Sequence, residues 1–387
     1  MMRRFSLPLI CLLIAAAVTP AAGAGYRTAV GGGADETPVV VVSGTPYEMG
    51  YSYGKLMAAE VRGCMERYLA AAKAEDAARY SDAALDAAWA TVAPHVPSRF
   101  IEEMRGVAAG AGVPYALIRR GHCVSLLEGL ACSALAVWGD ATANGRLYQI
   151  RNLDYTTDAG LQDYPAIVVY IPETGIAHAN VAFAGFVGSL AGLNARGLAL
   201  SEIGAWAMPV SLGDLDGVPF FVMFRDLLYD ASNLDQALDA VRRARRIKEY
   251  IYLIGDGRRR AAALIWAARV DIRVWSEGDV INPATVPRAG VLYSTQDDRA
   301  ADQHMRANYG SYNPQLAIAL SRLVAGGQGN LMNVVYDASG RQMWVAYAEG
   351  ATPAYERDYV HFRLSDYVRR PPRGSSLGQE KGSRAVN

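Results

Sequence analysis

Two short stretches of the chain hold the side chains best suited to chemistry, Ala131-Cys132-Ser133 and Arg151-Asn152-Leu153-Asp154. A run of β-forming residues starts at Cys132 and meets a second run through an Asn-Gly turn, which is typical of a hairpin. Pairing of the two strands would place Arg151 and Asp154 beside Cys132. A nearby guanidinium stabilises the thiolate, the nucleophilic form of cysteine, and a carboxylate can hold a primary amine by charge-assisted hydrogen bonds. The pattern therefore indicates a cysteine nucleophile, and a buried structural cysteine beside a surface Arg–Asp pair fits the same residues.

The first residues have the features of an export signal. Arg3 and Arg4 precede an apolar run from Phe5 to Val18, and Ala22-Gly23-Ala24 suits cleavage before Gly25. The run is shorter than the roughly 20 residues that a membrane span needs. We therefore expect residues 1–24 to be a signal peptide, the mature protein to be periplasmic or secreted, and no stable membrane anchor to be present.

The composition limits the partners of the protein. The 387 residues include 38 Lys and Arg against 38 Asp and Glu, so the formal net charge is zero. Because there is no basic field, nucleic acid is not an expected partner. The five histidines lack metal-ligand spacing and no glycine-rich phosphate loop is present, so we predict neither a metal nor a cofactor. His122 next to Cys123 suggests a Cys–His pair, but no Asn or Asp orienter accompanies it.

Removal of Cys11 with the signal leaves three cysteines, Cys64, Cys123 and Cys132. In an oxidising compartment an odd number implies one unpaired thiol. A disulfide between Cys64 and Cys123 would leave Cys132 free to react. Three buried thiols are the alternative, and the sequence does not decide between the two.

The periodicity of apolar residues divides the chain into two regions. Helical spacing predominates between about residues 47 and 118, and helices are expected over 46–69, 76–92 and 98–109 after a strand at 39–42. From residue 132 short β-type runs predominate, with helices over 220–229 and 314–324 and another after Ser232. The strands are expected at 133–138, 147–150, 166–171, 179–183, 198–201, 250–254, 262–266, 272–275, 290–294, 331–336 and 343–347. This order favours layered sheets covered by helices over a doubly wound parallel sheet. Residues 26–36 are expected to be irregular and the tail at 369–387 to be disordered.

Further motifs occur in an order that is typical of one family. They are Gly44-x5-Gly50-x3-Gly54, Ala131-Cys132-Ser133, Arg151-Asn152-x-Asp154, Gly185-Phe186-x-Gly188, Gly192-x-Asn194-x-x-Gly197-Leu198, and a closing strand pair at 334–337 and 343–346. With this set the sequence resembles the Cys-type N-terminal-nucleophile hydrolases of the acyl-coenzyme A:6-aminopenicillanic acid acyltransferase-like group (peptidase family C45). Choloylglycine hydrolases and acid ceramidases are more distant relatives. The resemblance covers most of the chain.

The resemblance implies an α+β fold, a four-layer αββα sandwich. A mostly helical N-terminal segment would cover residues 25–131 and a catalytic domain residues 132–368. It also implies a precursor that cuts itself between Ala131 and Cys132. The freed α-amine of Cys132, with a pKa of about 8, would move the proton while the thiol attacks the acyl carbon. The small and large chains of one precursor are expected to stay associated.

Supporting roles follow from the same resemblance. Arg151 would stabilise the thiolate, Asp154 would orient the α-amine, and the loop at Asn194 would supply an oxyanion donor. Glu202 falls where acid ceramidase-like members have a site glutamate, with a solvent-facing strand residue as the alternative.

Two later positions complete the predicted site. The family usually has Thr-Asn where this chain has Thr295-Gln296. The amide of Gln296 could then serve as the oxyanion donor from one methylene further out with a backbone shift, or the oxyanion hole could rely on other donors. Arg306 resembles a downstream arginine of the family, and an ordinary surface arginine fits the sequence equally well.

The expected reaction is hydrolysis of a small-molecule acyl-amide, such as an N-acyl amino acid, an acyl-amine or an acylated lactam, through a thioester on Cys132. Transfer of the acyl group to an amine acceptor would use the same thioester, but export argues against a cytoplasmic coenzyme A donor. An inactive member that acts as a binding protein is the third hypothesis.

Overall fold

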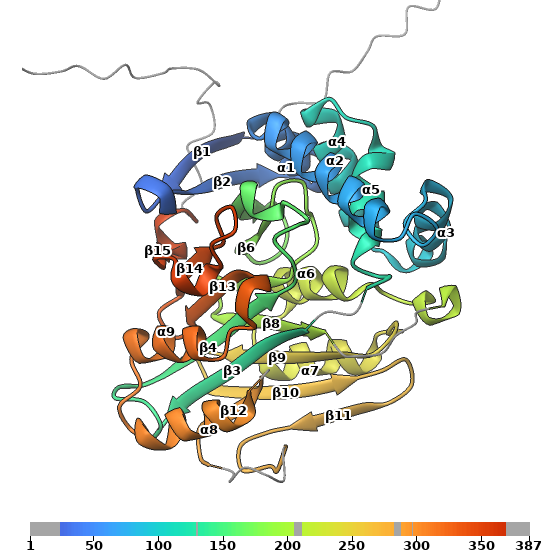
Figure 1. Ribbon diagram of the computed structural model, residues 1–387. Helices are drawn as coiled ribbons and strands as arrows, with labels where there is room; N and C mark the ends of the chain where they lie inside the picture. Colours follow the sequence, from blue (N-terminus) through green and yellow to red (C-terminus); the bar gives the residue numbers. More distant parts are fainter. Residues whose placement is uncertain (1–23, 129–130, 205–210, 282–287, 296, 369–387) are drawn as a thin grey trace, which may run out of the picture.

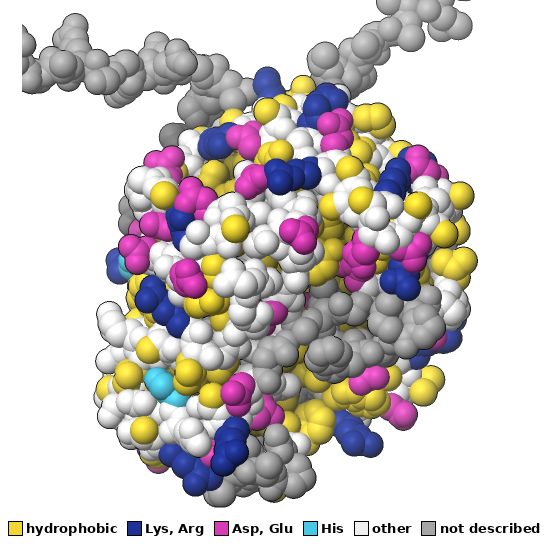
Figure 2. Space-filling model, viewed as in Figure 1, with side chains coloured by type: hydrophobic (Ala, Val, Ile, Leu, Met, Phe, Trp, Pro, Cys, Tyr) yellow, Lys and Arg dark blue, Asp and Glu magenta, His cyan; other side chains and the backbone are white. Residues whose placement is uncertain are grey.

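Figure 1 shows the computed structural model of the chain, which describes residues 24–128, 131–204, 211–281, 288–295 and 297–368. The predicted signal peptide up to residue 23, Gln296 and the predicted tail at 369–387 lie outside these ranges. Within them, no helix is both long and apolar enough to cross a membrane. On the face shown in Figure 2, basic and acidic side chains are interspersed, so this face has no field of a single sign.

The strands of the described ranges form two sheets. The nine-stranded sheet has the order β1-β2-β5-β6-β7-β8-β9-β10-β11 and the six-stranded sheet the order β12-β3-β4-β13-β14-β15. Neighbours are antiparallel except β2 and β5, which are parallel. The first sheet contains β1 (Ala24–Val30), β2 (Thr37–Gly44), β5 (Pro165–Pro172), β6 (His178–Phe183), β7 (Ala191–Asn194), β8 (Leu198–Gly204), β9 (Tyr250–Asp256), β10 (Ala261–Ala267) and β11 (Ile272–Trp275). The second contains β3 (Ala131–Gly139), β4 (Gly145–Asp154), β12 (Val291–Ser294), β13 (Asn330–Asp337), β14 (Gln342–Tyr347) and β15 (Val360–Arg363).

The two sheets pack face to face and helices cover their outer faces. Strands β3 and β4 lie against β8 and β9. The nine-stranded sheet is covered by α6 (Phe220–Asp230) and α7 (Leu234–Arg243), whereas α8 (Asp298–Ala307) and α9 (Pro314–Leu323) bury their apolar residues against the six-stranded sheet. The predicted four-layer αββα sandwich is therefore confirmed.

The N-terminal segment contributes both helices and strands. Its helices are α1 (Pro46–Leu56), α2 (Ala58–Glu75), α3 (Asp82–Val92), α4 (Ser98–Ala111) and α5 (Tyr115–Val124). The helix predicted over 46–69 is divided at Met57, and residues 26–36, predicted to be irregular, include most of β1. Because β2 pairs with β5, the segment is part of the larger sheet and does not form a separate layer.

The glycine motif at the start of the chain has a packing role. Helices α1 and α4 lie in close contact, and a Cβ at Gly50 would overlap the carbonyl oxygen of Glu103. A Cβ at Gly54 would overlap the carbonyl oxygen of Val107 in the same way. The glycines therefore allow the two backbones to approach more closely than side chains would permit.

Candidate active site

The hairpin formed by β3 and β4 brings Arg151 to Cys132. In the ladder Cys132 pairs with Leu153, and Ala134, two positions after Cys132, pairs with Arg151. The side chains of Cys132 and Arg151 therefore lie on the same face of the hairpin, on neighbouring strands. Its Nη1 donates to Sγ of Cys132 at 3.4 Å. The thiol is 3% exposed. Burial raises the pKa of Cys132 to about 11 in the intact chain, and the charge of Arg151 opposes this rise.

Glu202, on β8, binds the other side of the same guanidinium. Nη2 of Arg151 lies 3.2 Å from Oε2 of Glu202, and both side chains are fully buried. The third nitrogen, Nε, donates to the carbonyl of Leu190 at 3.3 Å. Burial raises the pKa of Glu202 to about 7, with Arg151 acting against the rise. Cys132, Arg151 and Glu202 thus form one buried cluster, the Cys132 cluster. Glu202 is part of it and is not a solvent-facing strand residue.

Asp154 lies at the end of β4, directly across from Ala131. It lies three positions after Arg151 on the strand, so the two side chains leave opposite faces. Its Oδ1 accepts from the backbone N–H of Gly326 at 2.9 Å and from Nδ2 of Asn330 at 2.8 Å. Its Oδ2 is buried and has no hydrogen-bond partner among the described residues. Burial raises the pKa of Asp154 above its usual value. A carboxylate with one free oxygen therefore lies beside the predicted cleavage junction.

Among the described residues, the side-chain contacts of two predicted site residues, Asn194 and Arg306, do not include the Cys132 thiol. The Nδ2 of Asn194 donates to the carbonyls of Leu228 and Ala231, and its Oδ1 accepts from the N–H groups of Arg196 and Leu198. The polar capacity of this amide is therefore used at the β7–β8 turn, so its side chain is not an oxyanion donor.

Arg306 lies on the surface of α8, where it is half exposed and pairs with Asp302 at 2.7 Å. This position favours the alternative of an ordinary surface arginine, and the site role of Arg306 stays a prediction. Gln296 lies outside the described residues, so its role stays a prediction.

The structure also adds buried polar residues that the sequence did not indicate. The ammonium of Lys248, 9% exposed, donates to the backbone carbonyl of Glu128. The side chain of Glu128 accepts from the Tyr155 hydroxyl at 2.7 Å. Burial raises the pKa of Glu128 to about 7 and lowers that of Lys248 to about 8. In the sequence Lys248 belongs to a charged run, Arg245-Arg246-Ile247-Lys248-Glu249, which is indistinguishable from a solvated surface.

An apolar cavity adjoins the cluster. Leu153, the cross-strand partner of Cys132, and Leu190, whose carbonyl binds Arg151, are two of its lining residues. Aromatic side chains form much of the remaining wall, including Tyr68, Tyr155, Phe186 and Phe221. Its free volume is about 30 Å³, which is about the volume that one molecule occupies in liquid water. In the intact chain this cavity is therefore almost filled, and Ser125, six residues before Ala131, lies in its wall.

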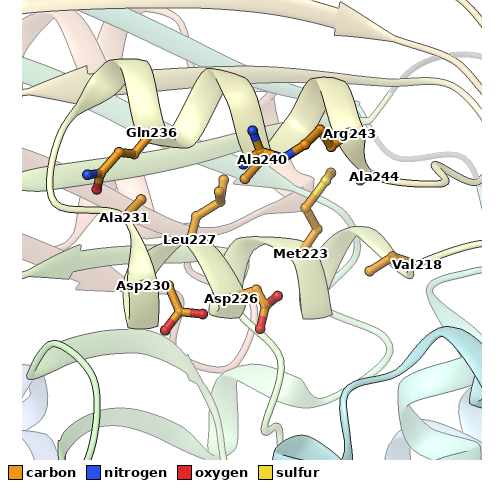
Figure 3. Close-up of a pocket in the computed structure, with 10 residues that line it drawn as sticks. All are labelled: Val218, Met223, Asp226, Leu227, Asp230, Ala231, Gln236, Ala240, Arg243 and Ala244. Atoms are coloured by element: carbon orange, nitrogen blue, oxygen red, sulfur yellow. The ribbon is translucent and has the colours of Figure 1, made fainter.

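A larger groove lies elsewhere, between α6 and α7. Figure 3 shows Asp226 and Asp230 on α6 with Arg243 on α7, around a volume of about 570 Å³. Its lining includes none of the residues of the Cys132 cluster. Both aspartates already form ion pairs with Arg99. We therefore assign the chemistry to the smaller cavity, since its lining touches the cluster through Leu153 and Leu190.

Cys64 and Cys123 do not form a disulfide, which settles the alternative that the sequence left open. Both residues are free thiols, as is Cys132, and all three are buried. Burial raises the pKa of Cys123 to about 12, so this thiol stays protonated at neutral pH. The alternative of three buried thiols is the arrangement in the structure.

The chain was compared with known proteins. A model of the family described as acyl-coenzyme A:6-aminopenicillanic acid acyl-transferase matches residues 141–281. This range includes Arg151, Asp154, Asn194 and Glu202 and begins downstream of Cys132.

Two curated relatives come from Dictyostelium discoideum. Protein dcd1B is 24% identical over 393 residues, covering 90% of this chain and 78% of that protein. Protein dcd1A is 24% identical over 378 residues, covering 85% of each chain. Among solved structures, a Caenorhabditis elegans ortholog of N-acylethanolamine-hydrolyzing acid amidase is 15% identical with a TM-score of 0.45, covering 59% of this chain and 98% of that one. The match of the family model confirms the predicted resemblance to the acyl-coenzyme A:6-aminopenicillanic acid acyltransferase-like family over residues 141–281.

Proposed function

We propose that this protein is an N-terminal-nucleophile cysteine amidohydrolase that cuts its own chain before Cys132 and then hydrolyses linear acyl-amides. The observation that carries the proposal is the 3.4 Å contact between Arg151 Nη1 and Cys132 Sγ, beside a carboxylate, Asp154, that faces Ala131 across the ladder. Such a reaction uses all three groups: the thiol and the cation meet on one face of the hairpin, and the carboxylate lies at the end of β4, across from the junction residue.

Self-cleavage would proceed through the peptide bond between Ala131 and Cys132. The Cys132 sulfur attacks the carbonyl carbon of Ala131, a C–S bond forms and the C–N bond breaks. The departing nitrogen takes a proton and becomes the α-amine of Cys132. Water then hydrolyses the thioester, which leaves a carboxylate on Ala131 and regenerates the thiol.

The mature site would repeat this chemistry on a substrate. The thiolate, stabilised by Arg151, attacks the acyl carbon, and the α-amine of Cys132 moves the proton from the thiol to the leaving amine. The free oxygen of Asp154 offers a charge-assisted hydrogen bond to that amine. Water resolves the thioester and releases the acid. The amide of Gln296 is the predicted donor to the oxyanion.

Two features support continued association of the cut chains. Strand β2 pairs with β5 in the shared sheet. Glu103 on α4 forms a fully buried ion pair with Arg225 on α6, with Oε1 and Oε2 each 3.1 Å from a guanidinium nitrogen. Separation of the chains would expose this sheet edge and leave both buried charges unpaired.

The decisive experiment is the denatured mass of the purified protein combined with activity on a panel of acyl-amides. We expect one fragment ending at Ala131, a larger one starting at Cys132, and hydrolysis of at least one member of the panel. Cys132→Ala should remain one chain without activity, and Cys123→Ala, another buried thiol, should be cut normally. A wild-type protein that stays as one chain yet hydrolyses the panel would refute the proposed mechanism.

A further inference from the structure

Residues 186–190, which we call the cavity strap, connect the apolar cavity to the catalytic cluster. Phe186, Gly188 and Leu190 line the cavity. The carbonyl of Leu190 accepts a hydrogen bond from Nε of Arg151. A displacement of the strap would therefore move a wall of the cavity and one of the anchors of Arg151 together.

The backbone of the strap is held by hydrogen bonds along its length. The N–H of Val187 donates to Nε2 of His122 at 2.9 Å, and the carbonyl of Val187 accepts from Arg225. The carbonyl of Gly188 accepts from Nδ2 of Asn180 at 2.8 Å, and the N–H of Ser189 donates to the carbonyl of Phe221 at 2.9 Å. The N–H and the carbonyl of Val187 are thus held by side chains from two different helices, α5 and α6.

His122 is the member of this set that comes from the N-terminal segment. It lies on α5 and is 1% exposed. Its Nδ1 lies 2.8 Å from the carbonyl of Ile118, which can only accept, so Nδ1 bears the hydrogen and Nε2 is free to accept from Val187. Its ring also contacts Phe186 and Phe221, at 5.2 and 5.4 Å between centroids. Both ring nitrogens are engaged in this way, so His122 is not a base for Cys123.

We propose that His122 is a positioning residue for the reaction at Cys132. His122 accepts a hydrogen bond from the N–H of Val187 and so holds the cavity strap in place. Because the strap lines the apolar cavity and binds Arg151, His122 also determines the position of that wall and the orientation of Arg151. This proposal rests on the proposed function, and it takes the apolar cavity as the place where the acyl group of the substrate binds. His122 is a better position to test than Arg225, because loss of Arg225 would also leave Glu103 buried without its partner.

A matched pair of substitutions separates this role from simple packing. His122→Asn places its amide near the position of Nδ1, within reach of Ile118 but not of Val187. His122→Gln places its amide near the position of Nε2, where it can still accept from Val187. We expect His122→Asn to raise KM about tenfold, the equivalent of one net hydrogen bond, with a smaller change in kcat. His122→Gln should stay close to wild type in KM.

The thiolate of Cys132 provides a second measurement, which requires no substrate. Titration of its ultraviolet absorbance should give a higher midpoint in His122→Asn than in His122→Gln, because the strap then holds Arg151 less well. Equal KM values and equal midpoints in the two folded variants would overturn the proposal. A wild type with no amidase activity would refute the proposed function alone, since the titration still compares the two variants. If His122→Asn does not fold, His122→Phe replaces it, and wild-type KM and midpoint in that variant would overturn the proposal.

Discussion

The guanidinium of Arg151 and the carboxylate of Glu202 form an ion pair, 3.2 Å apart, in which neither side chain reaches solvent. The same guanidinium contacts Cys132. The positive charge of Arg151 therefore acts on both the Glu202 carboxyl group and the Cys132 thiol. A negative Glu202 holds Arg151 in place but also raises the pKa of the Cys132 thiol, whereas Arg151 lowers it. Arg151 and Glu202 therefore have opposite effects on the pKa of the nucleophilic thiol.

This relationship predicts the effect of Glu202→Gln. The amide still accepts from Arg151 but has no negative charge, so the pKa of the Cys132 thiol should fall. Ultraviolet titration in a Cys64→Ala, Cys123→Ala background, where Cys132 is the last thiol of the mature chain, measures the shift. Arg151→Met in the same background should raise the midpoint, by about one to three units. A higher midpoint in Glu202→Gln would contradict the assigned geometry.

Asp154→Asn should preserve the fold and impair catalysis. The substitution retains an oxygen for Gly326 and Asn330 but removes the charge that would orient the α-amine. We expect kcat/KM to fall by about 10²–10⁴, the range of general acid–base contributions. Asp358→Asn, whose side chain is 90% exposed, is the control and should behave as wild type. Near-normal kcat/KM in correctly cut Asp154→Asn protein would remove Asp154 from the mechanism.

Arg306→Ala should have little effect on either activity or stability. The arginine is half exposed on α8 and pairs with Asp302, which Arg288 also binds. Exposed ion pairs contribute about 0–1 kcal/mol to the free energy of unfolding. We therefore expect kinetics close to wild type and a loss of less than about 1 kcal/mol in denaturant unfolding. A large loss of kcat with unchanged stability would support the role that the sequence suggested.

The part of the site that could be predicted from the sequence depends on local structure. The hairpin follows from two neighbouring β-type runs with turn residues between them, and its ladder pairs Ala131 with Asp154 and Ala134 with Arg151. Residues 140–144 connect the strands, and the register shifts between Val137 and Gly139. The layered architecture also follows from periodicity. Most predicted strands lie within one to four residues of their observed ends, and the strand predicted at 272–275 has the observed bounds.

The parts that failed depend on contacts between distant segments. Asn194 has the residue type of an oxyanion donor, but its amide is used by the carbonyls of α6 and of Ala231, which no local pattern reveals. Strands β7 and β15, of four residues each, were not predicted, and they lie in the sheets through pairing with β6, β8 and β14, which are distinct segments of the chain. Lys248 and Glu128 are 120 positions apart in the chain, so their contact has no signature in sequence.

The last prediction concerns the acid stability of the fold and uses His122. Burial lowers its pKa from the usual 6.5 to about 4. The unfolded chain therefore binds this proton more readily than the folded chain. The contribution of neutral His122 to stability is complete above about pH 6.5 and is lost as the pH falls through about 4. The shift corresponds to about 3 kcal/mol.

His122→Gln cannot titrate, so its free energy of unfolding should depend less steeply on pH in that window. Glu128 and Glu202 act in the opposite sense, because burial raises their pKa values to about 7 and their contribution is lost as the pH rises. Both glutamates are present in the two proteins, so their effect cancels in the difference. Urea unfolding of the uncut Cys132→Ala chain, with and without His122→Gln, at a series of pH values gives the two slopes. Equal slopes between pH 6.5 and about 4 would show that protonation of His122 does not contribute to the loss of stability in acid.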